Sequence, residues 1–156
     1  AQSPWSSRIC CHHADIKDFA SESKKKYDFI ISNPPFYTNQ LQSTNPKINH
    51  ARHEKGLKIH ELVQVVARLL HIDGLASVLL PPEETDRLID LAAGSSLFPT
   101  AQLFISDSEM KPAHAVVTLL SGKKANRETE NLCIKTPENT YSPAFISLLR
   151  AYYLYL

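Results

Sequence analysis

Apolar segments of strand length alternate with segments of helical period along this chain. The clearest strand candidate is residues 27–32, Tyr-Asp-Phe-Ile-Ile-Ser, and residues 8–12 form a weaker one. The stronger candidate ends at Asn33-Pro34-Pro35-Phe36, because proline has no N–H to donate to a sheet. The alternation predicts an α/β fold.

A helix with one apolar side is predicted after residue 58. Its apolar positions follow helical spacing and are Ile59, Leu62, Val63, Val66, Leu69 and Leu70. Asp73-Gly74 is then expected to turn the chain into a strand at residues 75–80, an unbroken apolar run typical of a strand covered on both faces. Together these segments predict a βαβ-like unit.

The remainder predicts one more helix and an antiparallel strand pair. Two prolines and two glutamates at residues 81–84 suit a helix N-terminus, and we expect that helix to end near Ala93, before Gly94. Residues 102–105 and 114–121 predict two strands with only a polar link between them, hence an antiparallel pair at one end of the sheet.

The C-terminal third ends in weaker signals. Residues 121–131 are polar and predict a loop, residues 132–135 predict a short extra strand, and residues 141–156 predict a closing helix. The sheet is therefore expected to be mostly parallel, with a C-terminal antiparallel pair.

Composition narrows the class of protein. The chain has 156 residues, of which 43% are hydrophobic, so residues 1–156 are expected to form a single domain. Lys plus Arg number 17 and Asp plus Glu 16, so nucleic-acid binding would have to be local. The longest apolar runs fall short of the roughly 20 residues that span a bilayer, and we expect a cytoplasmic protein with no membrane contact.

Two further expectations concern the thiols and the N-terminus. Cys10, Cys11 and Cys133 have no CxxC spacing and are predicted to be free thiols. None of the seven histidines forms a convincing metal cluster, and no metal is expected. The opening residues, Ala1 to Trp5, contain neither an initiator Met nor a signal peptide, so we expect the chain to have been cut from a longer one.

The chemistry is predicted at Asn33 to Phe36, because open α/β sheets bind ligands at the carboxyl ends of their strands. An aromatic amine is a poor nucleophile and must be held in line with its electrophile. The Asn33 amide oxygen and the Pro34 carbonyl can each accept one amino hydrogen, Pro35 stiffens the loop, and Phe36 offers a face for stacking. The alternative is that these four residues form an ordinary turn.

The strand together with Asn-Pro-Pro-Phe resembles motif IV of the class I S-adenosylmethionine-dependent amino-methyltransferases. Similarity extends over nearly the whole chain to the bacterial subfamily that methylates adenine N6 beside the anticodon of a valine tRNA. It is carried by Ser3-Pro4-Trp5 with Arg8-Ile9, His13-Ala14-Asp15-Ile16, Asn33 to Tyr37, Ala51-Arg52, and the tail Tyr141-Ser142 through Tyr152-Tyr153-Leu154.

The resemblance implies a Rossmann-like fold with S-adenosyl-L-methionine as cofactor and tRNA or another nucleic acid as partner. It makes Asn33 and Pro34 the amine-orienting pair, Phe36 the base-stacking aromatic, and Asp15 a contact to the adenine of the cofactor. Asp15 can equally cap the next helix, and Tyr37 can flank the target base or merely pack.

Charged residues elsewhere are weaker candidates. Arg52 and Lys55 lie in a polar connection that could meet phosphates, although a solvated loop is the default interpretation. Lys24-Lys25-Lys26, and Lys123-Lys124 with Arg127, are more simply explained as solvated charge.

One departure from the family concerns the cofactor. The family binds it through a Gly-rich loop and an acidic residue on earlier strands, yet the four glycines of this chain form no GxG. We therefore expect the C-terminal portion of a catalytic domain, inactive alone, with two central strands missing, a gap in the sheet and exposed apolar edges.

Three functions stay open from the sequence. The first is methylation of adenine N6 in tRNA. The second is transfer to another amino group, in rRNA guanine N2, DNA adenine N6 or protein glutamine N5. The third is a non-catalytic remnant that binds RNA or another partner. Nothing in the sequence indicates the oligomeric state.

Overall fold

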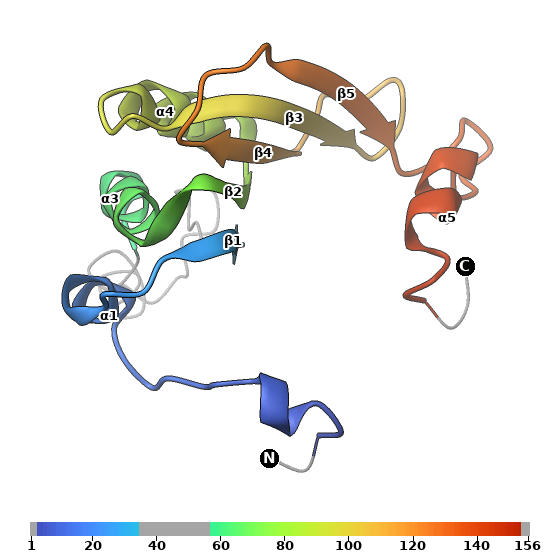
Figure 1. Ribbon diagram of the computed structural model, residues 1–156. Coiled ribbons are helices and arrows are strands. Elements are labelled where there is room, and N and C mark those ends of the chain that lie inside the picture. Colours follow the sequence, from blue (N-terminus) through green and yellow to red (C-terminus); the bar gives the residue numbers. More distant parts are fainter. Residues whose placement is uncertain (1–2, 35–56, 154–156) are drawn as a thin grey trace, which may run out of the picture.

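The computed structural model describes residues 3–34 and 57–153, which have a mixed α/β fold (Figure 1). The helical elements are η1 (Ser6–Arg8), α1 (Ile16–Glu22), α3 (Ile59–Leu69), α4 (Pro82–Ala93) and α5 (Pro143–Leu149). The strands are β1 (Tyr27–Ser32), β2 (Leu70–Leu80), β3 (Phe98–Ser106), β4 (Ala115–Ser121) and β5 (Glu128–Cys133).

These strands form one sheet in the order β1-β2-β4-β3-β5. β1 pairs with β2, and β3 with β5, in parallel, whereas β4 is antiparallel to both of its neighbours. Four strands therefore run in one direction and β4 alone runs back, as Figure 1 shows. This is the expected mostly parallel sheet with its antiparallel pair, although β5 lies outside β3, so the pair is not at the end of the sheet.

The core lies between the sheet and the helices α3 and α4. The apolar side of α3 contributes Leu62, Val63 and Val66, and α4 contributes Leu88. They pack against Ala76, Val78 and Leu80 of β2, which point to that face because side chains alternate along a strand. The stripe predicted from helical spacing is thus the buried side of α3, except that Leu70 is the first residue of β2.

Several predicted boundaries were wrong. Residues 8–12 form no strand: Ser6–Arg8 is a 3₁₀ turn, and the residues after it are exposed and extended. The expected gap is also absent from the described sheet, because the strand that should lie beyond it does not form. Exposed apolar side chains are nevertheless present on β1, where Phe29 and Ile31 are 53% and 74% exposed.

Asp73-Gly74 is not a turn before β2, because the strand already begins at Leu70. The irregularity is inside the strand: Tyr27 pairs with Leu70, but Phe29 pairs with Leu75. A Cβ atom on Gly74 would lie 2.9 Å from the carbonyl oxygen of Asp28, so the backbones approach too closely there for a side chain. The predicted turn was therefore wrong, and Gly74 is explained by the close approach of β1.

The C-terminal third also differs from its prediction. β5 begins at Glu128, inside the segment predicted as a loop, because its backbone pairs with β3 while its polar side chains stay exposed to solvent. Within the described part of the predicted closing helix, only Pro143–Leu149 is helical. Ser142 caps it, since its hydroxyl accepts a hydrogen bond from the backbone N–H of Phe145 at 3.1 Å. The helix α4, by contrast, ends at Ala93 as predicted.

Candidate functional site

Asn33 and Pro34 lie at the carboxyl end of β1, beside the longer strand β2. Ser32 is the last residue of β1 and pairs with Val78, while β2 continues to Leu80. The Asn33 side chain is exposed, whereas Pro34 is buried. The amide is therefore accessible to a ligand while the residue after it is fixed by packing.

The remaining members of the predicted motif lie outside the described residues. These are Pro35, Phe36 and Tyr37, together with Arg52 and Lys55 of the following connection. Their stacking and RNA-contact roles stay predictions from the sequence.

Asp15 is the N-cap of α1. Its Oδ1 accepts a hydrogen bond from the backbone N–H of Lys17 at 2.8 Å, which satisfies one of the free donors of the first turn. The capping role predicted for Asp15 is thus confirmed. Capping engages one carboxylate oxygen, so a contact from the other oxygen to the adenine of the cofactor stays a prediction.

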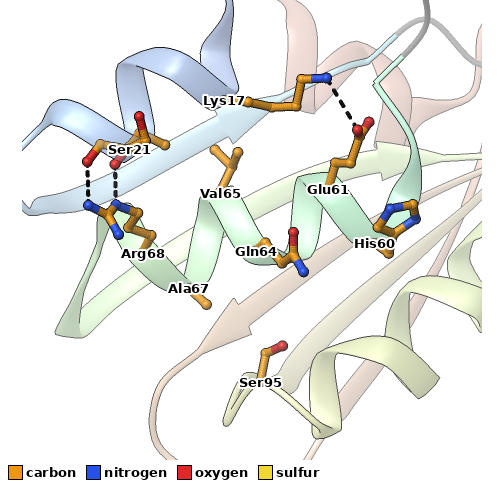
Figure 2. A pocket seen from close by; sticks show the side chains of 10 residues that line it. Lys17, Ser21, His60, Glu61, Gln64, Val65, Ala67, Arg68 and Ser95 are labelled. Carbon is orange, nitrogen blue, oxygen red and sulfur yellow. Dashed lines mark hydrogen bonds and ion pairs between the residues drawn. The ribbon is translucent and has the colours of Figure 1, made fainter. Parts of the chain in front are cut away.

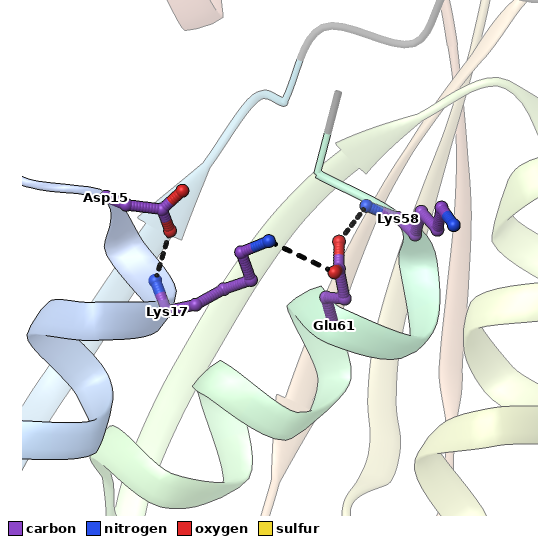
Figure 3. A network of polar contacts seen from close by, with 4 residues as sticks. All are labelled: Asp15, Lys17, Lys58 and Glu61. Atoms are coloured by element: carbon purple, nitrogen blue, oxygen red, sulfur yellow. Dashed lines mark hydrogen bonds and ion pairs between the residues drawn. The ribbon is translucent and has the colours of Figure 1, made fainter. Parts of the chain in front are cut away.

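A polar network connects this cap to α3 (Figure 3). Lys17 Nζ donates to Glu61 Oε1 at 3.2 Å, and the backbone N–H of Lys58 donates to Glu61 Oε2 at 2.9 Å. The Lys58 N–H and the Lys17 ammonium hold the pKa of the Glu61 carboxyl below its ordinary value. In return, the hydrogen bond and charge of Glu61 raise the pKa of Lys17. The network joins the first turns of α1 and α3.

An apolar cavity of about 280 Å³ lies along β1, between α1 and α3. Ile16, which follows Asp15, and Ser32, which precedes Asn33, both line it. The ends of α1 and β1 that carry the two predicted site residues therefore meet at one cavity. Phe19 and Phe29 also line it and were not predicted as site residues. For Phe29 there was a sequence signal, because apolar residues occupy both faces of residues 27–32.

These residues fit one end of S-adenosyl-L-methionine. The apolar lining suits a flat base. Asp15 precedes the lining residue Ile16 in the chain but is not itself among the lining residues, so its contact to the amino group of that base stays a prediction. The ribose and methionine ends would need an acidic residue and a close backbone approach, and no GxG is present in the chain. The described residues thus suit the adenine end of the cofactor alone.

A second, more polar hollow of about 710 Å³ lies on the helical layer (Figure 2). Lys17 and Glu61 lie along it, and Arg68 donates to the carbonyl oxygens of Ala20 and Ser21. The Arg68 guanidinium is thereby engaged in holding α1 against α3. We interpret this hollow as a helix-packing groove with mixed charge.

The basic runs lie away from Asn33. Lys24-Lys25-Lys26 precede β1, and Lys123-Lys124 follow β4, the reversed strand. Both therefore lie at the amino ends of the parallel strands, opposite the carboxyl ends where Asn33 lies. Lys123 is paired with Asp73, and Lys124 Nζ lies 5.1 Å from the centroid of the Phe98 ring.

Two absences apply to residues 3–34 and 57–153. No group of three or more His, Cys, Asp and Glu side chains there is arranged to hold a metal ion. No helix in these ranges has the length and apolar character needed to cross a membrane. The cysteines of this part are free; Cys10 Sγ lies 3.3 Å from His12 Nε2 on the surface.

Comparison with known sequences finds relatives over nearly the whole chain. The chain is 33% identical to a tRNA1(Val) (adenine(37)-N6)-methyltransferase of Shewanella woodyi, over 97% of this chain and 67% of the relative. It is 35% identical to the protein of the same name from Pectobacterium carotovorum, over 99% of this chain and 62% of the relative. The chain thus spans about two thirds of the length of these relatives. No family model matches it.

Comparison with solved structures supports the fold. A predicted O-methyltransferase from Agrobacterium tumefaciens superposes with a TM-score of 0.60 at 16% identity, covering 89% of this chain and 58% of that one. At this identity the match bears on the fold alone, and it agrees with a methyltransferase-like sheet.

Proposed function

The chain belongs to the family of the tRNA1(Val) (adenine(37)-N6)-methyltransferases, and on that premise we propose that it carries the target-base half of such an enzyme. The catalytic domain, completed by the part of the family's length that this chain does not span, transfers a methyl group to N6 of an adenine beside the anticodon. The observation that carries the proposal is the position of Asn33-Pro34, at the carboxyl end of β1 and next to the cavity bordered by Ile16 and Ser32.

Catalysis here depends on holding the amine. The lone pair of an adenine amino group is delocalised into the ring, so the amine must be oriented before it can attack. The Asn33 Oδ1 and the Pro34 carbonyl each accept one amino hydrogen, which directs the lone pair away from them. S-adenosyl-L-methionine, when bound, supplies the methyl group as an electrophile on its sulfonium sulfur. Because Pro34 is buried, its carbonyl is fixed before substrate arrives.

The base is held by residues of the same loop. In this proposal Phe36 stacks on the extruded adenine and Tyr37 flanks it, a stacking contact that contributes about 1–3 kcal/mol. Arg52 and Lys55 contact the RNA backbone. We expect the protein to act in the cytoplasm, where tRNA is available.

The direct test is methyl transfer by the complete catalytic domain from labelled S-adenosyl-L-methionine to defined acceptors. We expect transfer to a valine tRNA transcript and none to the same transcript with guanine in place of the target adenine. Stronger transfer to an rRNA fragment, a DNA duplex or a glutamine-containing peptide would mean that this acceptor, and not tRNA, is the substrate. RNA binding without transfer to any acceptor would favour a non-catalytic remnant.

A further inference from the structure

A cleft of about 620 Å³ lies at the far end of the sheet from Asn33. One wall is residues 107–111, which follow β3, and the other is residues 134–139, which follow β5. Hydrogen bonds hold the walls in place: the backbone N–H of Lys135 donates to the Asp107 carbonyl at 2.9 Å, and Lys111 Nζ lies 3.2 Å from Asp107 Oδ2. The cleft is therefore built by two loops that contact each other directly.

Although the cleft is several strands away from Asn33, the sheet topology places both at the carboxyl ends of the parallel strands. β1, β2, β3 and β5 run in one direction, so the carboxyl end of β1 and the loops that follow β3 and β5 lie on the same side, at the right of the sheet in Figure 1. Three strand spacings separate β1 from β3, about 14 Å at 4.7–4.9 Å each. A stacked strand rises about 3.4 Å per nucleotide, so this distance corresponds to about four nucleotides.

The lining suits an unpaired base better than a phosphate. The charges within the cleft nearly cancel, since Asp107 and Glu109 oppose Lys111 and Lys135. Asp107 is already paired with Lys111, and Lys135 Nζ donates to Asn139 Oδ1 at 2.9 Å. A neutral, partly apolar cleft gives little attraction to a phosphate, but its hydroxyl, amide and carboxylate groups can bond to the edges of a base.

Met110 supplies an apolar surface at this cleft. It is 93% exposed, so it contributes almost nothing to the core, and it lines the cleft together with Ile134 and Pro137. The thioether side chain is flexible and polarisable, and it makes favourable contacts with aromatic rings. A flat base lying against Met110 would bury surface that is now open to water.

We propose that this cleft is a second RNA subsite, which binds an unpaired base a few nucleotides away from the target adenine. The inference rests on the proposed function for its choice of RNA, and it assigns to the loops after β3 and β5 a role in substrate length and affinity. The target base is held at Asn33, and the RNA beside it runs along the carboxyl ends of the strands to Met110.

The test compares two substrates of the complete catalytic domain: a trinucleotide centred on the target adenine, and an 11-mer with five nucleotides on each side. Met110→Ala is expected to raise KM for the 11-mer about fivefold or more, a loss typical of one base contact. The kcat and the KM for the trinucleotide stay within about twofold. Met110→Phe, which keeps a surface for stacking, is expected to restore the KM for the 11-mer. Leu91→Ala, which removes an apolar side chain of similar size from the exposed side of α4, is the matched control.

Equal effects of Met110→Ala on both substrates, or no effect on the 11-mer, would overturn the subsite. Failure of the proposed function is a separate result: the wild-type protein would then methylate neither these RNAs nor the valine tRNA transcript. In that case binding of a labelled 11-mer, measured by fluorescence anisotropy, decides the inference by itself. Binding at least about fivefold weaker in Met110→Ala supports it, and equal binding overturns it.

Discussion

Lys17 in the first turn of α1 and Glu61 in the first turn of α3 form an ion pair, with 3.2 Å between Nζ and Oε1. The residues are far apart in the sequence, and the pair fixes the N-terminal end of α1, which carries Asp15, against α3. The carboxylate also accepts from the backbone of Lys58, so it is held on two sides. The ionised Glu61 carboxylate therefore stabilises the packing of α1 against α3.

The pair predicts a pH-dependent contribution to stability. The pKa of Glu61 is lowered in the fold, so its contribution is present above its ordinary value of 4.5 and is lost as pH falls through the lowered pKa. The pKa of Lys17 is raised, so its contribution is present below its ordinary value of 10.5 and is lost as pH rises through the raised pKa. Glu61→Gln should therefore destabilise the protein more at neutral pH than at about pH 3.

Urea unfolding of the wild type, Glu61→Gln, Lys17→Met and the double variant measures this effect at both pH values. The coupling between the two substitutions should shrink at low pH and in about 1 M salt, where exposed charges are screened. A coupling that is the same at both pH values would show that the pair contributes by packing rather than by charge.

Asn33→Ala is predicted to lower kcat of the complete catalytic domain about 100-fold or more, with little effect on RNA binding. The reason is that the amide oxygen is proposed to orient the amine mainly in the transition state. Single-turnover methylation and RNA titration measure the two quantities separately. Asn131→Ala, an exposed asparagine on β5, is the matched control. Near-normal kcat in Asn33→Ala would remove this residue from the mechanism.

Phe36→Ala is predicted to weaken methylation of RNA, whereas Phe36→Tyr should be tolerated because both aromatics keep a face for stacking. The expected loss corresponds to about 1–3 kcal/mol of stacking, measured as kcat/KM on the tRNA transcript. Phe145→Ala, in α5 and outside the predicted site, is the control for loss of an aromatic side chain elsewhere in the protein. Equal activity of the Phe36 Ala and Tyr variants would assign the ring to packing.

The 156-residue chain by itself is predicted to bind S-adenosyl-L-methionine with a dissociation constant weaker than about 1 mM. Millimolar affinity requires about 4 kcal/mol, whereas one hydrogen bond from Asp15 contributes about 0.5–1.5 kcal/mol net. Calorimetric titration measures this, with circular dichroism to establish that the chain is folded. A dissociation constant in the low micromolar range would mean that the cofactor site is built differently from the family pattern.

The free edge of β1 predicts self-association of the isolated chain. Phe29 and Ile31 expose apolar surface on a strand that pairs only with β2 within the described sheet. Such an edge can pair with another copy, and a lysine on it opposes this. Ile31→Lys should lower the mass seen by sedimentation at about 100 µM toward that of a monomer. A wild-type chain that is already monomeric at this concentration would contradict the prediction.

The sequence alone determined the elements whose pattern is local. The strand at Tyr27–Ser32 follows from apolar residues ended by two prolines, and the buried side of α3 follows from helical spacing. The end of α4 at Ala93 follows from the glycine after it. The family, and with it the chemistry expected at Asn33, was also readable, because motif IV is a contiguous run of residues.

Tertiary structure decided what depends on distant partners. Residues 8–12 form no strand, since extended backbone needs a neighbour to pair with, whereas the polar residues from Glu128 become β5 because β3 supplies one. Gly74 belongs to a strand because the backbone of β1 lies close to it. The cavity between Ile16 and Ser32, and the cleft beside Met110, each join segments that sequence spacing does not relate. The direction of the strands brings these segments together, and strand direction is a property of the whole sheet.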